Sequence, residues 1–369
     1  MEYQHGGDIY SNQVKWDFSA NVNPLGMPED VKEAVRRSAE ESGCYPDSQC
    51  RKLVKSLAAY HQVQEEMILC GNGAADLIFQ IAFALKPKTG LVMAPTFSEY
   101  AQALAAAESQ VMFFPLKEEE GFAVNLVSLK GWVEEKIDEG NKPEIFFLCN
   151  PNNPTGLFLP AEELNSLAEF LEEKKIRLIL DECFVDFLEN PEEVSLIPYL
   201  REFPHLVILK AFTKLYAMAG LRLGYMLTAD QVLLEKIWKT RQPWPVSTPA
   251  QMAGLAALSQ EEYRCRTKEM IRDGRRQLAA GLSQLGFFVF PSQGNYLFFR
   301  DQRKGIQEGA LYRSCLKRGL LIRSCGNYPG LDGSYYRVCV KGKEENQILL
   351  SLLAEAVSEP FPSGQKEEG

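Results

Sequence analysis

The sequence predicts an α/β fold in which a mostly parallel sheet is flanked by helices. The first indication is the regular alternation of short apolar runs with amphipathic segments between residues 67 and 227. Alternation of this kind builds a parallel sheet that helices cover on both faces. The second indication is that the strand-like runs are almost wholly apolar, as burial on both faces requires.

The expected elements follow one another in order along this stretch. Strands are expected at 67–70, 90–94, 111–115, 144–149, 177–181, 206–210 and 222–227. Helices are expected at 75–85, 99–107, 126–137 and 161–174. In the later part of the chain, 264–284 is typical of a helix, and 287–290 and 335–340 are typical of strands.

Composition limits the classes of function. With 369 residues, 46% of them hydrophobic and 24% charged, the chain has the make-up of a soluble enzyme-sized protein. Its net charge of -9 argues against nucleic acid or a membrane as the main partner. Nine cysteines without a Cys-x-x-Cys pair and three histidines indicate neither a metal site nor a disulfide framework. We therefore expect a cytoplasmic protein without an export signal or membrane span.

One lysine has a setting that suggests covalent chemistry. Lys214 follows the apolar run 206–209 and precedes Arg222 by eight residues. A lysine on a loop after a buried strand is placed to bond to an aldehyde cofactor, while the arginine holds a phosphate. This combination suggests pyridoxal phosphate. Because an isolated lysine is usually a solvated surface residue, the interpretation depends on partners elsewhere in the chain.

Three such partners are present. Asp181 ends an apolar run, and a carboxylate at the carboxyl end of a parallel strand can pair with a protonated pyridine nitrogen. Asn153 lies in a rigid turn with two Asn-Pro steps, where its amide can donate to the ring oxygen of the cofactor. The glycine turn 71–73 opens a helix, and bare N–H groups at a helix start bind phosphate well.

The order of these motifs, glycine turn, Asn-Pro turn, Asp, Lys and Arg, resembles the fold-type I pyridoxal-phosphate enzymes of the aspartate aminotransferase superfamily. The resemblance covers nearly the whole chain. It implies a large cofactor-binding domain at 46–245 and a smaller α+β domain formed by both termini, 1–45 and 246–369. It also implies a homodimer with shared active sites.

Within that superfamily the chain looks most like two groups, the histidinol-phosphate aminotransferases and the threonine-phosphate decarboxylases of cobalamin synthesis. The segments 5–8, 17–26 and 321–331 favour the decarboxylases. Phe184 also favours them, because transaminases of this group usually carry tyrosine there. An aminotransferase acting on histidinol phosphate or an aromatic amino acid is the first alternative. A non-enzymatic regulator is the second, although no DNA-binding module is apparent before residue 45.

The resemblance assigns roles around the cofactor. Lys214 would carry it, Asp181 would pair with its ring nitrogen, Asn153 with its ring oxygen, and Phe97 would stack on the ring. The residues expected at its phosphate are Gly73, Ala74, Ala75, Thr213 and Arg222, with Tyr45 contributed across a dimer interface. The family usually has Ser or Thr where this chain has Ala211, so one phosphate hydrogen bond is expected to be missing.

The resemblance also assigns the substrate's two anionic groups. Arg337 would hold the α-carboxylate through its planar fork, next to Asn153. The substrate phosphate would fall to His5, Gly6, Asn23 and Arg323. The expected partner is therefore a small phosphorylated amino acid. The other two histidines, His61 and His205, are interpreted as surface residues.

Overall fold

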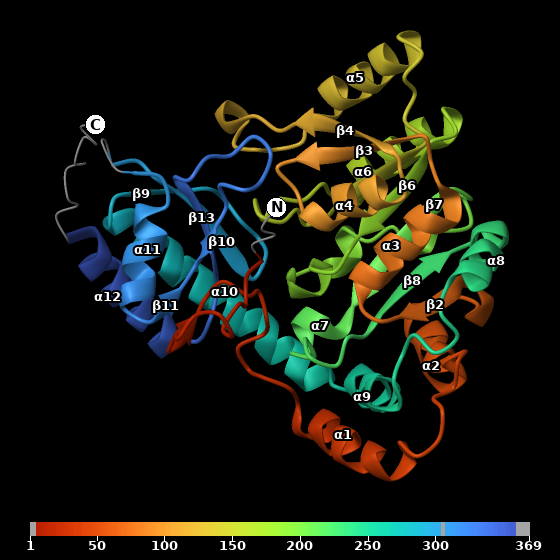
Figure 1. Ribbon diagram of the computed structural model, residues 1–369, viewed down its shortest axis with the longest axis horizontal. Helices are drawn as coiled ribbons and strands as arrows, with labels where there is room; N and C mark the ends of the chain where they lie inside the picture. Colours follow the sequence, from red (N-terminus) through yellow and green to blue (C-terminus); the bar gives the residue numbers. More distant parts are fainter. Residues whose placement is uncertain (1–4, 304–306, 359–369) are drawn as a thin grey trace, which may run out of the picture.

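The computed structural model describes residues 5–303 and 307–358, and its centre is a seven-stranded sheet (Figure 1). The strand order is β2-β8-β7-β6-β5-β3-β4, and β8 runs antiparallel to both of its neighbours while the other pairings are parallel. The expected α/β class with a mostly parallel sheet is thereby confirmed. The strands are β2 (Ile68–Gly71), β3 (Thr89–Ala94), β4 (Gln110–Pro115), β5 (Ile145–Cys149), β6 (Arg177–Asp181), β7 (Leu206–Ala211) and β8 (Gly224–Thr228).

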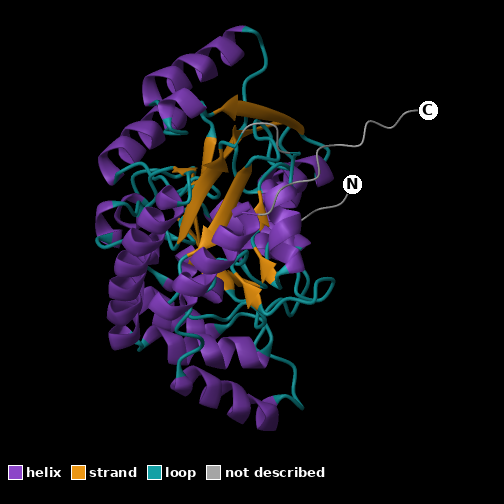
Figure 2. Ribbon diagram, turned by 90° about the vertical axis from the view of Figure 1, so that its left-hand side faces the viewer, coloured by secondary structure: helices purple, strands orange, loops and turns teal. Residues whose placement is uncertain are grey.

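Helices cover both faces of this sheet because successive strand residues point to opposite sides. Ile145 and Phe147 belong to one buried apolar cluster, with residues of α3, α4 and α8. Phe146 and Leu148 belong to the other, with residues of α5 and α6. The helices are α3 (Ala74–Leu85), α4 (Ser98–Ala106), α5 (Leu126–Asp138), α6 (Ala161–Glu173) and α8 (Gln231–Thr240). Figure 2 shows the strands in the interior with helices packed around them. The edge strand β4 departs most from full burial, whereas in the other strands of this sheet only Arg177 and Ala211 are partly exposed.

A second, smaller sheet has the order β12-β13-β10-β9 and is antiparallel. Its strands are β9 (Phe287–Val289), β10 (Tyr296–Asp301), β12 (Arg323–Ser324) and β13 (Tyr335–Cys339). Together with the helices α10 (Glu261–Gln284), α11 (Ala310–Lys317) and α12 (Lys343–Ser358), this sheet forms the second unit of the structure. On α10 the buried residues Thr267, Ile271, Gly274, Leu278 and Leu282 recur every three or four positions, so one face of this helix is buried.

The amino-terminal segment joins this second unit. β1 (Trp16–Asp17) pairs in parallel with β11 (Leu320–Leu321), and the Phe18 oxygen accepts a 2.8 Å hydrogen bond from the Cys339 N–H. Two helices, α1 (Glu29–Glu41) and α9 (Thr248–Leu258), pack on each other beside α2 (Arg51–His61), at the end of the large sheet (Figure 1). Domain boundaries at residues 45 and 246 stay a prediction.

The parallel strands bring their carboxyl ends to one edge of the large sheet. Asp181 at the end of β6 stands in register with Cys149 of β5 and Leu209 of β7. Residues that follow neighbouring strands therefore meet at this edge, which faces the second unit. Among the described residues no helix has the length and apolar character needed to cross a membrane.

Candidate active site

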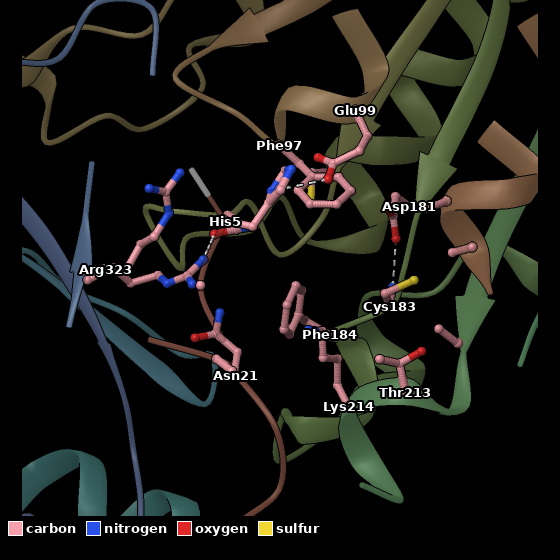
Figure 3. A pocket seen from close by; sticks show the side chains of 18 of the residues that line it. His5, Asn21, Phe97, Glu99, Asp181, Cys183, Phe184, Thr213, Lys214 and Arg323 are labelled. Atoms are coloured by element: carbon pink, nitrogen blue, oxygen red, sulfur yellow. Dashed lines mark hydrogen bonds and ion pairs between the residues drawn. The ribbon is translucent and has the colours of Figure 1, made fainter. Parts of the chain in front are cut away.

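A cavity of about 260 Å³ lies at the carboxyl edge of the large sheet. It brings together side chains that are far apart in the sequence, from the amino-terminal segment, the large sheet and the second sheet (Figure 3). The expected site residues that line it are His5, Gly6, Ala74, Ala75, Phe97, Asn153, Asp181, Thr213, Lys214, Arg222, Arg323 and Arg337.

Lys214 enters the cavity from the short helix α7 (Phe212–Leu215), directly after β7. Burial, and secondly the charge of Arg337, lower the pKa of its amine from 10.5 to about 8. No hydrogen bond or ion pair engages this amine within residues 5–303 and 307–358. An amine without a protein partner, whose pKa is lowered toward neutral pH, loses its proton more readily than an ordinary lysine, as a nucleophile that bonds to an aldehyde requires.

Asp181 is held by two donors at the end of β6. The Tyr100 hydroxyl donates to its Oδ2 at 2.6 Å, and the Cys183 N–H donates to its Oδ1 at 3.0 Å. Burial and the charge of Asp181 raise the pKa of Tyr100 well above its usual value, so Tyr100 remains a donor. These two donors fix the orientation of the carboxylate, which suits it to pair with a protonated ring nitrogen.

An anion cradle lies where Gly73, the start of α3 and Arg222 converge. Gly73 has φ +84°, and a Cβ built on it would come within 2.7 Å of Nη2 of Arg222. The N–H groups of Ala74 and Ala75 lie in the first turn of α3, which has no side-chain cap. A guanidinium and open helical N–H groups together suit a phosphate.

A slot for a flat ring lies beside Asp181. Phe97 lines the cavity and meets Tyr100 edge to face, with ring centroids 5.5 Å apart. In Figure 3, Cys183 and Phe184 lie on the other side of the slot. Phe184 is itself held by Tyr296, with centroids 5.1 Å apart. Apolar contact on two faces and a carboxylate at the rim suit a protonated aromatic ring.

Two arginines of the second sheet form the opposite wall. Arg323 on β12 and Arg337 on β13 stand directly opposite each other in the antiparallel register, and each is 5% exposed. Like charges in this position repel each other, so the pair favours anionic ligands. Arg337 donates to the Asn153 amide oxygen and, at 2.6 Å, to the Ser19 carbonyl.

Part of this arginine pair is still available to a ligand. Nε of Arg337 is buried without a partner among the described residues. Arg323 donates to the Ser324 carbonyl at 2.6 Å and to the Asn327 side chain at 2.9 Å. An unpaired buried donor on a charged group is costly, which a carboxylate in the cavity would relieve.

The amino-terminal segment forms part of the cavity wall through His5 and Gly6. Gly6 fits closely against Ser19, where an added Cβ would lie 2.2 Å from the Ser19 carbonyl oxygen. The Gly7 N–H donates to the Ser19 hydroxyl at 2.7 Å. His5, which comes just before this contact, forms a 3.4 Å ion pair with Glu99 (Figure 3).

Two expected residues and one histidine lie elsewhere. Asn23 does not line the cavity, because its amide nitrogen donates to the Leu215 carbonyl at 2.8 Å and to the Thr267 hydroxyl at 2.7 Å. Tyr45 lies outside the cavity of its own chain, with 78% of its surface exposed. His61 is no simple surface residue. It is hydrogen-bonded to the Tyr225 hydroxyl at 2.8 Å, and burial lowers its pKa to about 3.

Sequence reasoning missed other residues of the site. Glu99, Tyr100 and Cys183 line the cavity, as do Asn21 and Tyr328. Tyr100 lies three residues after Phe97, which is the spacing of one helical turn. This spacing was the sequence signal that could have identified Tyr100 as a site residue. Asn21 carried the same signal as Asn23, since both belong to one Asn-rich segment.

The residues fit pyridoxal phosphate. The cavity offers an unpaired amine, an oriented carboxylate at the rim of an apolar slot, and a guanidinium beside a helix start. A ring with a protonated nitrogen, an aldehyde and a phosphate needs these three features at once.

Comparison with known proteins agrees with this chemistry. The family model "Aminotransferase class I and II" matches residues 13–353. The threonine-phosphate decarboxylase of Salmonella typhimurium is 37% identical, over 97% of this chain and 98% of its own. The histidinol-phosphate aminotransferase of Halalkalibacterium halodurans is 33% identical, over 93% of this chain and 89% of its own. The crystal structure of the histidinol-phosphate aminotransferase from Clostridium acetobutylicum superimposes with a TM-score of 0.83 at 29% identity, over 92% of this chain and 98% of that chain.

Proposed function

The chain belongs to the aminotransferase class I and II family, and from this premise we propose that it decarboxylates L-threonine O-3-phosphate or a close O-phosphorylated amino acid. The product is the amino-alcohol phosphate used in the cobalamin side chain. The cofactor is pyridoxal 5'-phosphate.

The observation that carries this proposal is the opposed pair Arg323 and Arg337, with His5 beside Arg323 in the same cavity. Arg222 and Lys214 are assigned to the cofactor, so these three groups remain for the substrate. Two separate cationic centres match a substrate with a carboxylate at one end and a phosphate at the other.

Each residue of the site has a separate role in the proposed reaction. Arg337 binds the substrate carboxylate, while Arg323 and His5 bind its phosphate, so the substrate is anchored at both ends. Asp181 keeps the ring nitrogen protonated, and the bound cofactor supplies an electron sink for the pair left at the α carbon. Lys214 returns a proton to that carbon after carbon dioxide leaves. Its pKa of about 8 allows the amine to exchange protons near neutral pH.

The proposal includes a homodimer in which Tyr45 reaches the cofactor phosphate of the partner subunit. Tyr45 stacks on Trp244 with ring centroids 4.4 Å apart. Trp244 is 42% exposed, as is the nearby Trp238. A group of exposed aromatic side chains of this size is typical of an interface, which supports this part of the proposal.

The alternative is transfer of the amino group from histidinol phosphate, because relatives with that name are also similar to this chain. Holoenzyme is incubated with L-threonine O-3-phosphate, and released carbon dioxide and amino-alcohol phosphate are measured. A parallel reaction contains histidinol phosphate and 2-oxoglutarate, with glutamate as the readout. Carbon dioxide in the first reaction supports the proposal. Glutamate in the second, with no carbon dioxide in the first, overturns it.

A further inference from the structure

We propose that Glu99 couples substrate binding to the uptake of a proton. In the free cavity Glu99 pairs with His5, and it takes up a proton when a phosphate dianion binds between His5 and Arg323. This coupling selects for ligands that carry a phosphate. This inference rests on the proposed function, because it uses the same placement of the substrate phosphate. It concerns binding rather than the reaction that follows.

The geometry places a carboxylate where an anionic ligand is expected. Glu99 lies in the first turn of α4, and its Oε1 is 3.4 Å from Nδ1 of His5 (Figure 3). The Glu99 side chain is 15% exposed, whereas that of His5 is 47% exposed. Its second oxygen accepts a 3.0 Å hydrogen bond from the Ser98 hydroxyl. Glu99 therefore acts as an internal substitute for the ligand's negative charge.

A charge count shows the conflict that a phosphate creates. Once Arg337 is assigned to the substrate carboxylate, the groups left for the phosphate are Arg323, His5 and Glu99. With Glu99 ionised their sum is at most +1, because Arg323 gives one positive charge, His5 gives a second only when it carries a proton, and Glu99 gives one negative charge. A phosphate dianion needs about +2. Protonation of Glu99 supplies the difference and removes the repulsion between two anions.

The surroundings of Glu99 lower the free-energy cost of protonating its carboxylate. Burial raises the pKa of Glu99, while His5 of the amino-terminal segment, Ser98 of its own helix and Lys214 of α7 act in the opposite direction. When the phosphate takes over His5, the principal stabilising charge is lost and a dianion is added nearby. Both changes raise the pKa further. An unphosphorylated amino acid brings no such charge, so it leaves the pair of His5 and Glu99 in place.

The test measures proton uptake by calorimetry on the holoenzyme, with propyl phosphate as a ligand that carries neither an amine nor a carboxylate. Titrations at about pH 8 in two buffers of different ionisation enthalpy give the protons taken up per ligand. At this pH the phosphate is already a dianion, since its second pKa is about 6, so the proton goes to the protein. The variants are Glu99→Gln and His5→Gln, with Glu163→Gln, an exposed carboxylate on α6, as the control for charge loss.

We expect wild-type protein and Glu163→Gln to take up a measurable fraction of a proton per ligand, and His5→Gln to take up protons as well, because its Glu99 carboxylate still meets the dianion. Glu99→Gln should take up clearly less, and should bind propyl phosphate roughly ten-fold more tightly at pH 8, because the repulsion is gone. Its affinity should also fall less steeply as the pH rises. Unchanged uptake in Glu99→Gln, or weaker binding at every pH, would overturn the proposal, because Glu99 would then only hold His5 in place.

The same data separate this inference from the proposed function. Propyl phosphate binding with uptake that depends on Glu99, without carbon dioxide from L-threonine O-3-phosphate, removes the proposed reaction and keeps the proton linkage. Carbon dioxide release with uptake that does not depend on Glu99 removes the proton linkage alone. Failure of wild-type protein to bind propyl phosphate overturns the phosphate subsite and this inference together.

Discussion

The Tyr100 hydroxyl donates a 2.6 Å hydrogen bond to Oδ2 of Asp181 and is fully buried beside it. Tyr100 also stacks on Phe147 of β5, with ring centroids 5.4 Å apart. The ring of Tyr100 is thus fixed by packing, and its hydroxyl points at the Asp181 carboxylate, which lines the cavity. The link joins α4 to the end of β6, across two elements that are distant in sequence.

Tyr100→Phe should weaken cofactor binding while keeping the packing on Phe147. Asp181 loses a charged hydrogen bond, a loss of roughly 1.5 to 3 kcal/mol, so the Kd for pyridoxal phosphate should rise roughly ten- to hundred-fold. The Kd is measured by titrating apoenzyme with the cofactor and following absorbance. Thermal unfolding of the apoenzyme serves as the control for folding. An unchanged Kd would show that Tyr100 contributes packing alone.

Gly73→Ala should damage the phosphate cradle. The added Cβ comes within 2.7 Å of the Arg222 guanidinium, and φ +84° is strained for alanine. Because the guanidinium must move away, cofactor affinity should fall about ten-fold or more. Gly220→Ala is the matched control, since that exposed glycine has open space around it. Equal losses in the two variants would contradict the cradle.

The large sheet could be predicted from the sequence because its strands are buried on both faces and its helices have one apolar face. Lys214 and Asp181 were accessible for a related reason, since they lie at or just after the carboxyl ends of parallel strands, which must meet at one edge. Arg222 precedes the antiparallel strand β8, and the signal for it was its spacing of eight residues from Lys214. This logic needs only local patterns and the rules of parallel sheets.

The remaining site residues depend on contacts between distant segments. Asn21 and Asn23 are equivalent in sequence, and only packing against Leu215 and Thr267 takes Asn23 out of the cavity. Glu99 is one of many acidic residues in helical segments of the sequence, and its partner His5 comes from the amino-terminal segment, which joins the second unit. Such pairings follow from tertiary structure, which no local pattern encodes.

Ala211→Ser should tighten cofactor binding. Ala211 ends β7 and lines the cavity together with Thr213, at the position where the family usually carries a hydroxyl. A serine hydroxyl there can donate to the cofactor phosphate, and a charged hydrogen bond of this kind should lower the Kd by roughly ten-fold. Equilibrium dialysis of holoenzyme measures the change. Ala211→Val, which adds bulk without a donor, is the control and should not bind more tightly. If serine and valine have the same effect, the hydroxyl does not reach the phosphate.

Lys214→Met should stabilise the apoenzyme at pH 7 while abolishing turnover. The pKa of Lys214 is about 8 in the folded chain against an ordinary value of 10.5. The unfolded chain therefore holds the proton more tightly, and folding with a charged Lys214 carries a cost on the order of 3 kcal/mol as an upper value. The cost is present in full below about pH 8, and it is relieved as the pH rises from there toward 10.5. Apoenzyme stability should thus increase with pH in this window, and Lys214→Met should remove that increase.

Urea unfolding of cofactor-free protein at pH 7 and pH 9 measures both effects. The variant should exceed wild type in free energy of unfolding at pH 7, and the difference should be smaller at pH 9 because the wild-type amine is by then mostly neutral. Lys317→Met, an exposed position on α11, controls for the general effect of replacing lysine with methionine and should show no such pH dependence. A Lys214→Met apoenzyme less stable than wild type at pH 7 would mean that the amine is not held at an energetic cost, and the physical basis for its reactivity as a nucleophile would fail with it.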